Sequence, residues 1–245
     1  MVSTMVTDIR CQEMPVVEYG ACNLKERMRK MEQAAAEGIL AVVATPHFNE
    51  QMDRTALEQY IRGWDQLHTL MQKKKISITL YPGNEIFYSE NALRSLARGE
   101  AMGMNDTRYV LVEFAPYTDY RYMRMAIQQM QYEGYWPILA HVERYTNVIN
   151  RMDKAVGLKE DTGCYFQVNA ASITGEYGFT TKKVTRKLLR EELVEFIATD
   201  AHRNEGKRSP KMKACAEWVE KKMGREKAEK IFRRNPEAIL ADQMM

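Results

Sequence analysis

The sequence predicts an α/β protein built around a parallel β-sheet. Two observations favour this fold class: short β-branched or aromatic runs alternate with amphipathic stretches along the chain, and polar side chains stand where the apolar runs stop. About seven strands with polar residues at their ends favour a closed barrel. An open doubly wound sheet is the structural alternative, but no GxGxxG or P-loop motif supports a nucleotide-binding version of it.

The expected elements follow one another without a linker, a repeat or a low-complexity tract. We expect strands at about 5–9, 39–45, 76–84, 108–114, 136–141, 164–169 and 194–199. Helical spacing of apolar residues predicts helices at 24–37, 54–73, 89–98, 122–133 and 181–192. A charged amphipathic segment at 210–233 follows. We therefore expect a single domain over 1–245, with a C-terminal helical segment at about 210–235 packed on it.

Composition narrows the class of protein. The chain has 245 residues, of which 45% are hydrophobic and 28% charged, and a net charge of +3. This charge is too small to predict a nucleic-acid partner. No apolar run approaches the roughly 20 residues of a membrane span, and the N-terminus lacks the apolar region of a signal peptide. The four cysteines form no CxxC pair and are expected to be reduced thiols of a cytoplasmic protein.

Three of the four histidines stand where a strand-like run ends. They are His47, His141 and His202, and carboxylates hold comparable positions at Glu85, Glu113 and Asp200. Parallel strands place such ends at one edge of a sheet, where side chains converge. Imidazole and carboxylate together are the ligand set for zinc, manganese or iron. The pattern therefore predicts a metal site, whereas His68, inside a helical run, fits a surface or boundary position.

Other polar residues near these positions allow two interpretations each. Glu85 follows a Gly-Asn turn and is either a metal ligand or the cap of a loop. Arg144 is suited to clamping a phosphate, or it pairs with the neighbouring Glu143 on the surface. Asn169 either orients a substrate or caps a turn. Glu113 lies within VLVEFA, where a buried carboxylate without a partner would be costly.

Six motifs, in order and spacing, resemble the metal-dependent protein-tyrosine phosphatases of the CpsB/CapC type: ATPHF, GNEI, VLVEF, PILAHVERY, FQVNAASITGEYG and FIATDAH. Those enzymes belong to the polymerase-and-histidinol-phosphatase (PHP) superfamily, and the resemblance covers about residues 8–236. It implies a PHP-type distorted TIM-like (β/α)7 barrel, a multinuclear site usually assigned to manganese, and hydrolysis of phosphotyrosine. The implied partner is the tyrosine-rich tail of a bacterial kinase that controls capsule or exopolysaccharide export.

Carried over motif by motif, the resemblance implies metal ligands and one catalytic residue. The implied ligands are His47, Glu85, Glu113, His141, Asp200 and His202. Arg144 matches the arginine that holds the phosphate, while the metals and Arg144 stabilise charge on the phosphoryl oxygens. A cysteine nucleophile is not needed. Consistently, none of the four cysteines is followed by arginine at the Cys-x5-Arg spacing of thiol-dependent phosphatases.

The first expected strand departs from the family pattern. Where the family has a His-x-His pair and then a ligating aspartate, this chain has Arg10, Gln12 and Tyr19. Neither arginine nor glutamine replaces imidazole as a metal ligand, and the fixed charge of arginine repels a cation. One metal position is left with Glu85 and Asp200 alone and should hold no ion. We therefore expect one or two divalent ions rather than three, with Mn²⁺ as the expected metal.

Buried carboxylates need a compensating charge. We therefore hypothesise that the Arg10 guanidinium lies near this position and pairs with Asp200 or Glu85. A further metal position, that of Glu113 and His202, lacks its ligating aspartate. Glu18 is the residue whose carboxylate would have to replace it.

The remaining metal positions differ in the ligands that they keep. One retains His47, Glu85 and His141, which form an open three-ligand site. The other retains Glu113 and His202 and is expected to be weak.

Three functions follow as hypotheses. The first is a phosphatase that works with one or two metal ions. The second is a degenerate, non-catalytic relative that binds a phosphotyrosine tail through Arg10, Arg144 and the residual site. The third is a phosphoesterase of the same superfamily that acts on a small molecule, although the NAASITGEYG motif resembles the tyrosine phosphatases more closely.

Overall fold

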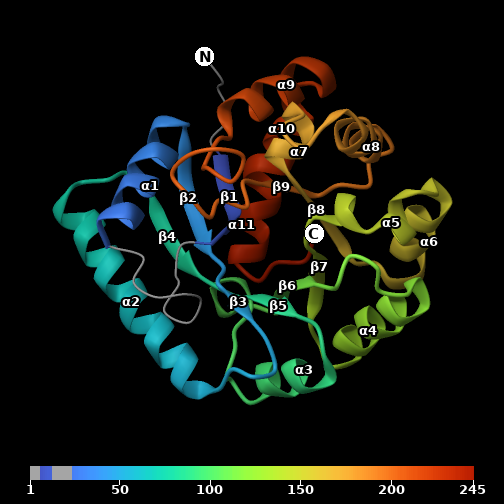
Figure 1. The fold of residues 1–245 in the computed structure, drawn as a ribbon, viewed down its shortest axis with the longest axis horizontal. Coiled ribbons are helices and arrows are strands. Elements are labelled where there is room, and N and C mark those ends of the chain that lie inside the picture. The colour runs from blue at the N-terminus through green and yellow to red at the C-terminus, as the bar shows by residue number, and fades with distance from the viewer. Residues whose placement is uncertain (1–5, 13–23) are drawn as a thin grey trace.

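Parallel strands form the centre of the fold, and helices surround them (Figure 1). The structure, a computed structural model, describes residues 6–12 and 24–245. The strands are β1 (Val6–Cys11), β2 (Ile39–Ala44), β3 (His47–Phe48), β4 (Thr79–Pro82), β5 (Glu85–Phe87), β6 (Tyr109–Glu113), β7 (Trp136–Leu139), β8 (Tyr165–Asn169) and β9 (Phe196–Ala198). Their order is β1-β2-β4 in one sheet and β3-β5-β6-β7-β8-β9 in the other, with every neighbouring pair parallel.

The short strands β3 and β5 continue β2 and β4 past a break. Ala44 pairs with Pro82 before the break, and His47 pairs with Glu85 after it, so the register is unchanged. Pro46, which has no N–H to donate, lies in the break between β2 and β3. Its carbonyl accepts a 3.1 Å hydrogen bond from the Glu85 N–H. The strands of the described residues thus occupy seven positions, as the sequence predicts.

The sheet curls until its last strand meets its first. The Asp200 N–H donates to the Arg10 carbonyl at 3.0 Å, and the Gln12 N–H donates to the Ala201 carbonyl at 2.9 Å. The Asp8 carboxylate also joins β1 to the end of β9, because it accepts hydrogen bonds from the N–H and the hydroxyl of Thr199. The predicted TIM-like barrel is therefore confirmed, and the open doubly wound sheet is wrong.

The predicted helices are present, with ends shifted by a few residues at most positions. The helices are α1 (Leu24–Ala36), α2 (Arg54–Lys73), α3 (Glu90–Ala97), α4 (Tyr120–Tyr132), α5 (Thr146–Ile149), α6 (Met152–Thr162), α7 (Ala170–Thr174), α8 (Phe179–Arg190), α9 (Lys213–Met223), α10 (Arg225–Glu229) and α11 (Asn235–Leu240). Both ends of α2 match the prediction, and the Asp53 carboxylate caps it by accepting from two backbone N–H groups. We did not predict α5, α6 or α7.

The C-terminal segment is divided and enters the barrel. Gly224, with φ of 88°, separates α9 from α10, and a π-helical turn at Lys230–Arg234 joins α10 to α11. Ile239 of α11 is fully buried in an apolar cluster that also contains Ile9, Val43 and Phe196 from the strands. This cluster fills the barrel interior, and Figure 1 shows α11 close to the central strands. A larger apolar cluster lies between the strands and the surrounding helices.

A search of the described residues for a helix long and apolar enough to cross a membrane finds none.

Candidate metal centre and active site

All six predicted ligands lie at the carboxyl-terminal side of the barrel strands. His47 and Glu85 open β3 and β5, Glu113 ends β6, His141 follows β7, and Asp200 and His202 follow β9. Each belongs to a different strand position except the last two. The fold therefore brings to one end of the barrel residues that are up to 155 positions apart in sequence (202 minus 47).

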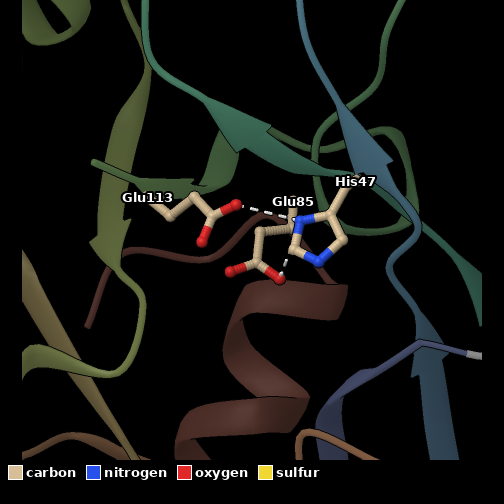
Figure 2. Close-up of side chains that lie close together, drawn as sticks. All are labelled: His47, Glu85 and Glu113. Carbon is tan, nitrogen blue, oxygen red and sulfur yellow. Dashed lines mark ion pairs between the residues drawn. The ribbon is translucent and has the colours of Figure 1, made fainter. Parts of the chain in front are cut away.

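His47, Glu85 and Glu113 form the most compact group (Figure 2). The His47 Nδ1 atom lies 2.9 Å from Glu113 Oε1 and 3.8 Å from Glu85 Oε2. One ligand-type atom from each residue lies within 4.8 Å of the other two. Burial disfavours the Glu113 carboxylate, but hydrogen bonds from His141 and His47 outweigh burial and hold its pKa below the usual range. The group is therefore anionic at neutral pH and suited to a divalent cation.

His141 lies against both carboxylates of this group. Its Nε2 atom is 3.1 Å from Glu113 Oε2 and 3.4 Å from Glu85 Oε1. Its backbone has φ of 38°, in the left-handed region that a residue with a Cβ seldom adopts. The Gln167 side chain stabilises this conformation by accepting the His141 N–H at 2.7 Å. Strain of this kind concentrates at functional sites, where it fixes the direction of a side chain.

Arg10 lies where the sequence hypothesis puts it, between two carboxylates. Its Nε donates to Glu85 Oε2 at 2.8 Å, and its Nη1 lies 2.9 Å from Asp200 Oδ1. The side chain is 1% exposed, and both acids are fully buried. Burial disfavours the charged guanidinium, but Asp200 and Glu85 outweigh burial and raise its pKa further. The hypothesis named one acid or the other, whereas Arg10 pairs with both.

Gln12 adds a second contact to the same acid, because its Nε2 donates to Glu85 Oε2 at 2.6 Å. Two protein donors thus occupy this oxygen, while the buried Oε1 accepts no hydrogen bond. A buried carboxylate oxygen without a donor calls for a cation. The group of His47, Glu85, Glu113 and His141 therefore fits a divalent metal. The position between Glu85 and Asp200 does not, because Arg10 already fills it with positive charge.

Two arginines and an amide surround the Asp200 carboxylate. Besides Arg10, Arg144 Nη2 lies 3.1 Å from Asp200 Oδ2, and Asn169 Nδ2 donates to the same oxygen at 3.0 Å. Burial raises the pKa of Asp200, but Arg10, His202 and Arg144 outweigh burial and lower it to about 2. Asp200 also has a left-handed backbone, with φ of 56°. Its carboxylate anchors the two arginines in this structure rather than joining the compact group.

His202 lies beside the compact group without belonging to it. Its ring centroid is 6.0 Å from that of His47. Its Nδ1 is 2.8 Å from the Asp200 carbonyl, a contact in which Nδ1–H donates and Nε2 is left as the free nitrogen. Burial dominates its environment and lowers the pKa of His202 to about 4. The ring is therefore neutral at pH 7, as a metal ligand must be.

The predicted alternatives for several polar residues are resolved. Glu85 is a buried strand residue and not a loop cap. The alternative of a surface salt bridge between Arg144 and Glu143 is wrong: Arg144, at the end of a 3-10 turn (Val142–Arg144), pairs with Asp200. Glu143 Oε1 instead accepts the Asn169 N–H at 2.9 Å and the Ser172 hydroxyl at 2.6 Å. The Asn169 side chain does not cap α7; its Oδ1 accepts from Arg10 Nη1 at 3.3 Å, and its Nδ2 donates to Asp200 Oδ2 at 3.0 Å.

Some predictions fall outside these contacts. Glu18 and Tyr19 lie in 13–23, outside the described residues. His68 stacks on Trp64 of α2, with ring centroids 4.9 Å apart, and is a half-buried boundary residue as predicted. The sequence places Gln12 at the His-x-His pair but predicts no partner for it, and Gln167 was not predicted as a site residue. Gln167 had a signal, because it stands two residues before Asn169 on a strand and so faces the same side.

Comparison with known proteins decides the family. Residues 6–241 match the family described as capsular polysaccharide synthesis, CpsB/CapC. This match covers nearly the whole chain. The chain belongs to the CpsB/CapC family.

Relatives of this family agree in sequence and in fold. The tyrosine-protein phosphatase CpsB of Streptococcus pneumoniae is 30% identical over 234 residues, which cover 94% of this chain and 96% of CpsB. The tyrosine-protein phosphatase YwqE of Bacillus subtilis is 29% identical over 195 residues, covering 80% of this chain and 76% of YwqE. A crystal structure from a study of YwqE and CpsB, described as unique metal-dependent tyrosine phosphatases, superposes with a TM-score of 0.86 at 27% identity. It covers 98% of this chain and 96% of its own.

A more distant neighbour shares the fold alone. The phosphotriesterase homology protein of Escherichia coli has a TM-score of 0.62 at 11% identity, covering 97% of this chain and 99% of its own. Its barrel type agrees with the curled parallel sheet of this CpsB/CapC member.

Proposed function

We propose that this protein is a metal-dependent protein-tyrosine phosphatase whose centre holds one or two divalent ions, with manganese as the expected metal. The observation that carries the proposal is the compact group of His47, Glu85 and Glu113, with His141 against both acids. Support comes from relatives named tyrosine-protein phosphatase over most of the chain. The proposed metal ligands are these four residues and His202, while Asp200 serves the arginines.

A metal ion bound by this group supplies positive charge that polarises a phosphoryl oxygen and makes water a better nucleophile. The protein's own part is to fix and orient the substrate. Arg144, 30% exposed at the edge of the site, uses one contact on Asp200 and keeps further N–H groups free for a phosphate. Arg10, fixed between Glu85 and Asp200, gives the site a positive charge that does not depend on metal supply. The net effect is stabilisation of charge on the phosphoryl group.

The proposed substrate is a phosphotyrosine protein of the cytoplasm, the tail of a bacterial tyrosine kinase that controls capsule or exopolysaccharide synthesis. This proposal is supported by the family's description and by the names of its relatives.

Turnover of a phosphotyrosine peptide with added Mn²⁺ tests the enzyme. We expect hydrolysis that EDTA abolishes and that Mn²⁺ restores. His141→Ala removes a side chain in contact with both acids, so we expect a loss of at least about 100-fold in kcat/KM. His68→Ala is the matched control, because His68 stacks on Trp64 in α2 and should leave turnover unchanged. Equal activity of the two variants would contradict the proposal.

A second function is favoured by one specific feature. Arg10 and Arg144 both pair with Asp200. The carboxylate of Asp200, which the sequence predicts as a metal ligand, thus binds two arginines instead. A site that keeps its arginines but loses metals suits a phosphotyrosine-binding regulator without turnover. Calorimetry with the same peptide separates the two: tight binding without hydrolysis in Mn²⁺ supports the regulator, whereas hydrolysis supports the enzyme.

A further inference from the structure

A pocket of about 580 Å³ opens beside the metal group. His47 and Glu113 of the metal group line it, and the rest of its lining includes Phe48, Gln51 and Phe87. Its size is that of a small-molecule site. The partly exposed ligands mark its direction: His47 is 24% and Glu113 16% exposed, whereas Glu85 is fully buried. The metal group therefore opens toward this pocket.

Phe87 is the exposed apolar side chain in the lining of this pocket. It is the last residue of β5, two positions after Glu85, and pairs in register with Glu113 of β6. Side chains at i and i+2 of a strand face the same side, and neighbouring strands lie about 4.8 Å apart. The Phe87 side chain therefore lies next to Glu113 and on the same side of the sheet as Glu85, two residues closer to the carboxyl-terminal end of the strands. It is 41% exposed, although the other ring in the pocket wall, Phe48, is 2% exposed.

Charge is distributed unequally around the metal group. The side chains that line the pocket in the described part of the chain include no lysine or arginine, and they include the acids Glu50 and Glu113. The guanidinium groups of Arg10 and Arg144 lie instead with Asp200, at the carboxyl ends of β1 and β9. A phosphate ester bound at the metal group will thus direct its anionic oxygens toward the arginines. Its uncharged organic group is left for the side of Phe87.

We propose that Phe87 is a specificity-determining residue whose exposed ring packs against the aromatic ring of the substrate, so that the site selects aryl over alkyl phosphates. The proposal rests on the proposed function, because it assumes a phosphate ester at the metal group. An aromatic ring packed against another contributes binding free energy beyond that of the buried area. An aliphatic group does not provide this additional free energy. Phe87 itself touches no reacting atom.

Binding of two phosphonates that cannot be hydrolysed tests this without turnover. The probes are phenylphosphonate and methylphosphonate, titrated into the Mn²⁺-loaded protein by calorimetry. We expect the wild type to bind phenylphosphonate about 3- to 10-fold more tightly, and Phe87→Ala to lose this preference without weakening methylphosphonate. Phe179→Ala is the matched control, because Phe179 is 80% exposed at the start of α8. Its preference should equal that of the wild type.

Kinetics with p-nitrophenyl phosphate and an alkyl phosphate give the second readout. Phe87→Ala should raise KM for the aryl ester by the same factor and leave kcat within about twofold, the pattern of lost ground-state binding. A phenyl preference that Phe87→Ala retains, or its absence in the wild type, overturns the inference. Hydrolysis without aryl preference overturns the inference but keeps the phosphatase. Aryl preference in binding without hydrolysis keeps the inference and overturns the phosphatase.

Discussion

Arg10 is a fully buried cation whose ionic partners are two fully buried acids, Glu85 and Asp200. A buried ion pair adds little net stability, yet removing one partner leaves uncompensated charge at a cost of about 3–5 kcal/mol. We therefore predict that Arg10→Met lowers the free energy of unfolding by about this amount in EDTA. Urea denaturation followed by circular dichroism measures it.

The same experiment has an internal control and a rescue. Arg94→Gln removes an exposed arginine of α3 that pairs with Glu90, and its urea midpoint should match that of the wild type. Excess Mn²⁺ should restore part of the stability of Arg10→Met, because a divalent ion can then replace the guanidinium. An unchanged urea midpoint for Arg10→Met would show that Arg10 is not the charge that balances these acids.

His202 makes the metal-free protein sensitive to acid. Burial lowers its folded-state pKa from 6.5 to about 4. The unfolded chain therefore takes up a proton near pH 6.5 and the folded chain only near pH 4, so stability falls as pH decreases through this window. We predict a loss of about 2–3 kcal/mol from this residue between pH 7 and pH 4.

The comparison with His202→Asn isolates this effect, because Asp8 acts in the opposite direction. Burial raises the pKa of Asp8 from 3.8 to about 6, so the folded state gains stability as pH falls through that range. Both proteins contain Asp8, and the difference between their unfolding free energies in EDTA reports His202 alone. A difference that does not change with pH would rule out a buried neutral imidazole.

The sequence predicts the chemistry of Arg10 because a guanidinium among acids has few alternatives. It does not predict Gln12, since an amide side chain has no obligatory partner. The alternative pairing of Arg144 with Glu143 fails for a geometric reason: with three residues per turn, adjacent side chains of a 3-10 turn point apart and find partners elsewhere. The pairing of Arg144 with Asp200 joins residues 56 apart in sequence and needs the closed barrel.

At the scale of elements, the strand ends were predictable and the breaks were not. Apolar runs mark the strands, and their polar ends place the site. The strand breaks before His47 and Glu85 have no sequence signal other than Pro46 and Gly83. The helix α6 escaped prediction because its apolar residues in MDKAVGLKEDT form no regular stripe.

The helix α11 completes the barrel interior, which gives an element-scale prediction. Ile239 is fully buried among strand residues of the inner cluster. Ile239→Ala should lower the free energy of unfolding by about 2–5 kcal/mol, the cost of a cavity in a packed core. Met244→Ala, at an 82% exposed position, should stay within about 0.5 kcal/mol of the wild type. Thermal unfolding of the two variants checks this, and equal midpoints would remove α11 from the core.

At the scale of the molecule, the barrel brings Arg10 from its first strand to Asp200 after its last. The backbone bonds between Arg10 and Asp200 and between Gln12 and Ala201 close the sheet at the point where the site forms. The first strand thus acts on the whole centre, because Arg10 supplies a permanent positive charge between Glu85 and Asp200 where the first and last strands meet.

The metal content of the purified protein tests the central claim most directly. Elemental analysis of protein saturated with Mn²⁺ and freed of excess should give one or two ions per chain for the wild type. Arg10→His combined with Gln12→His should give one ion more, because imidazoles then replace the guanidinium beside Glu85 and Asp200. An equal metal count in the two proteins would contradict the claim that Arg10 takes the place of a metal ion.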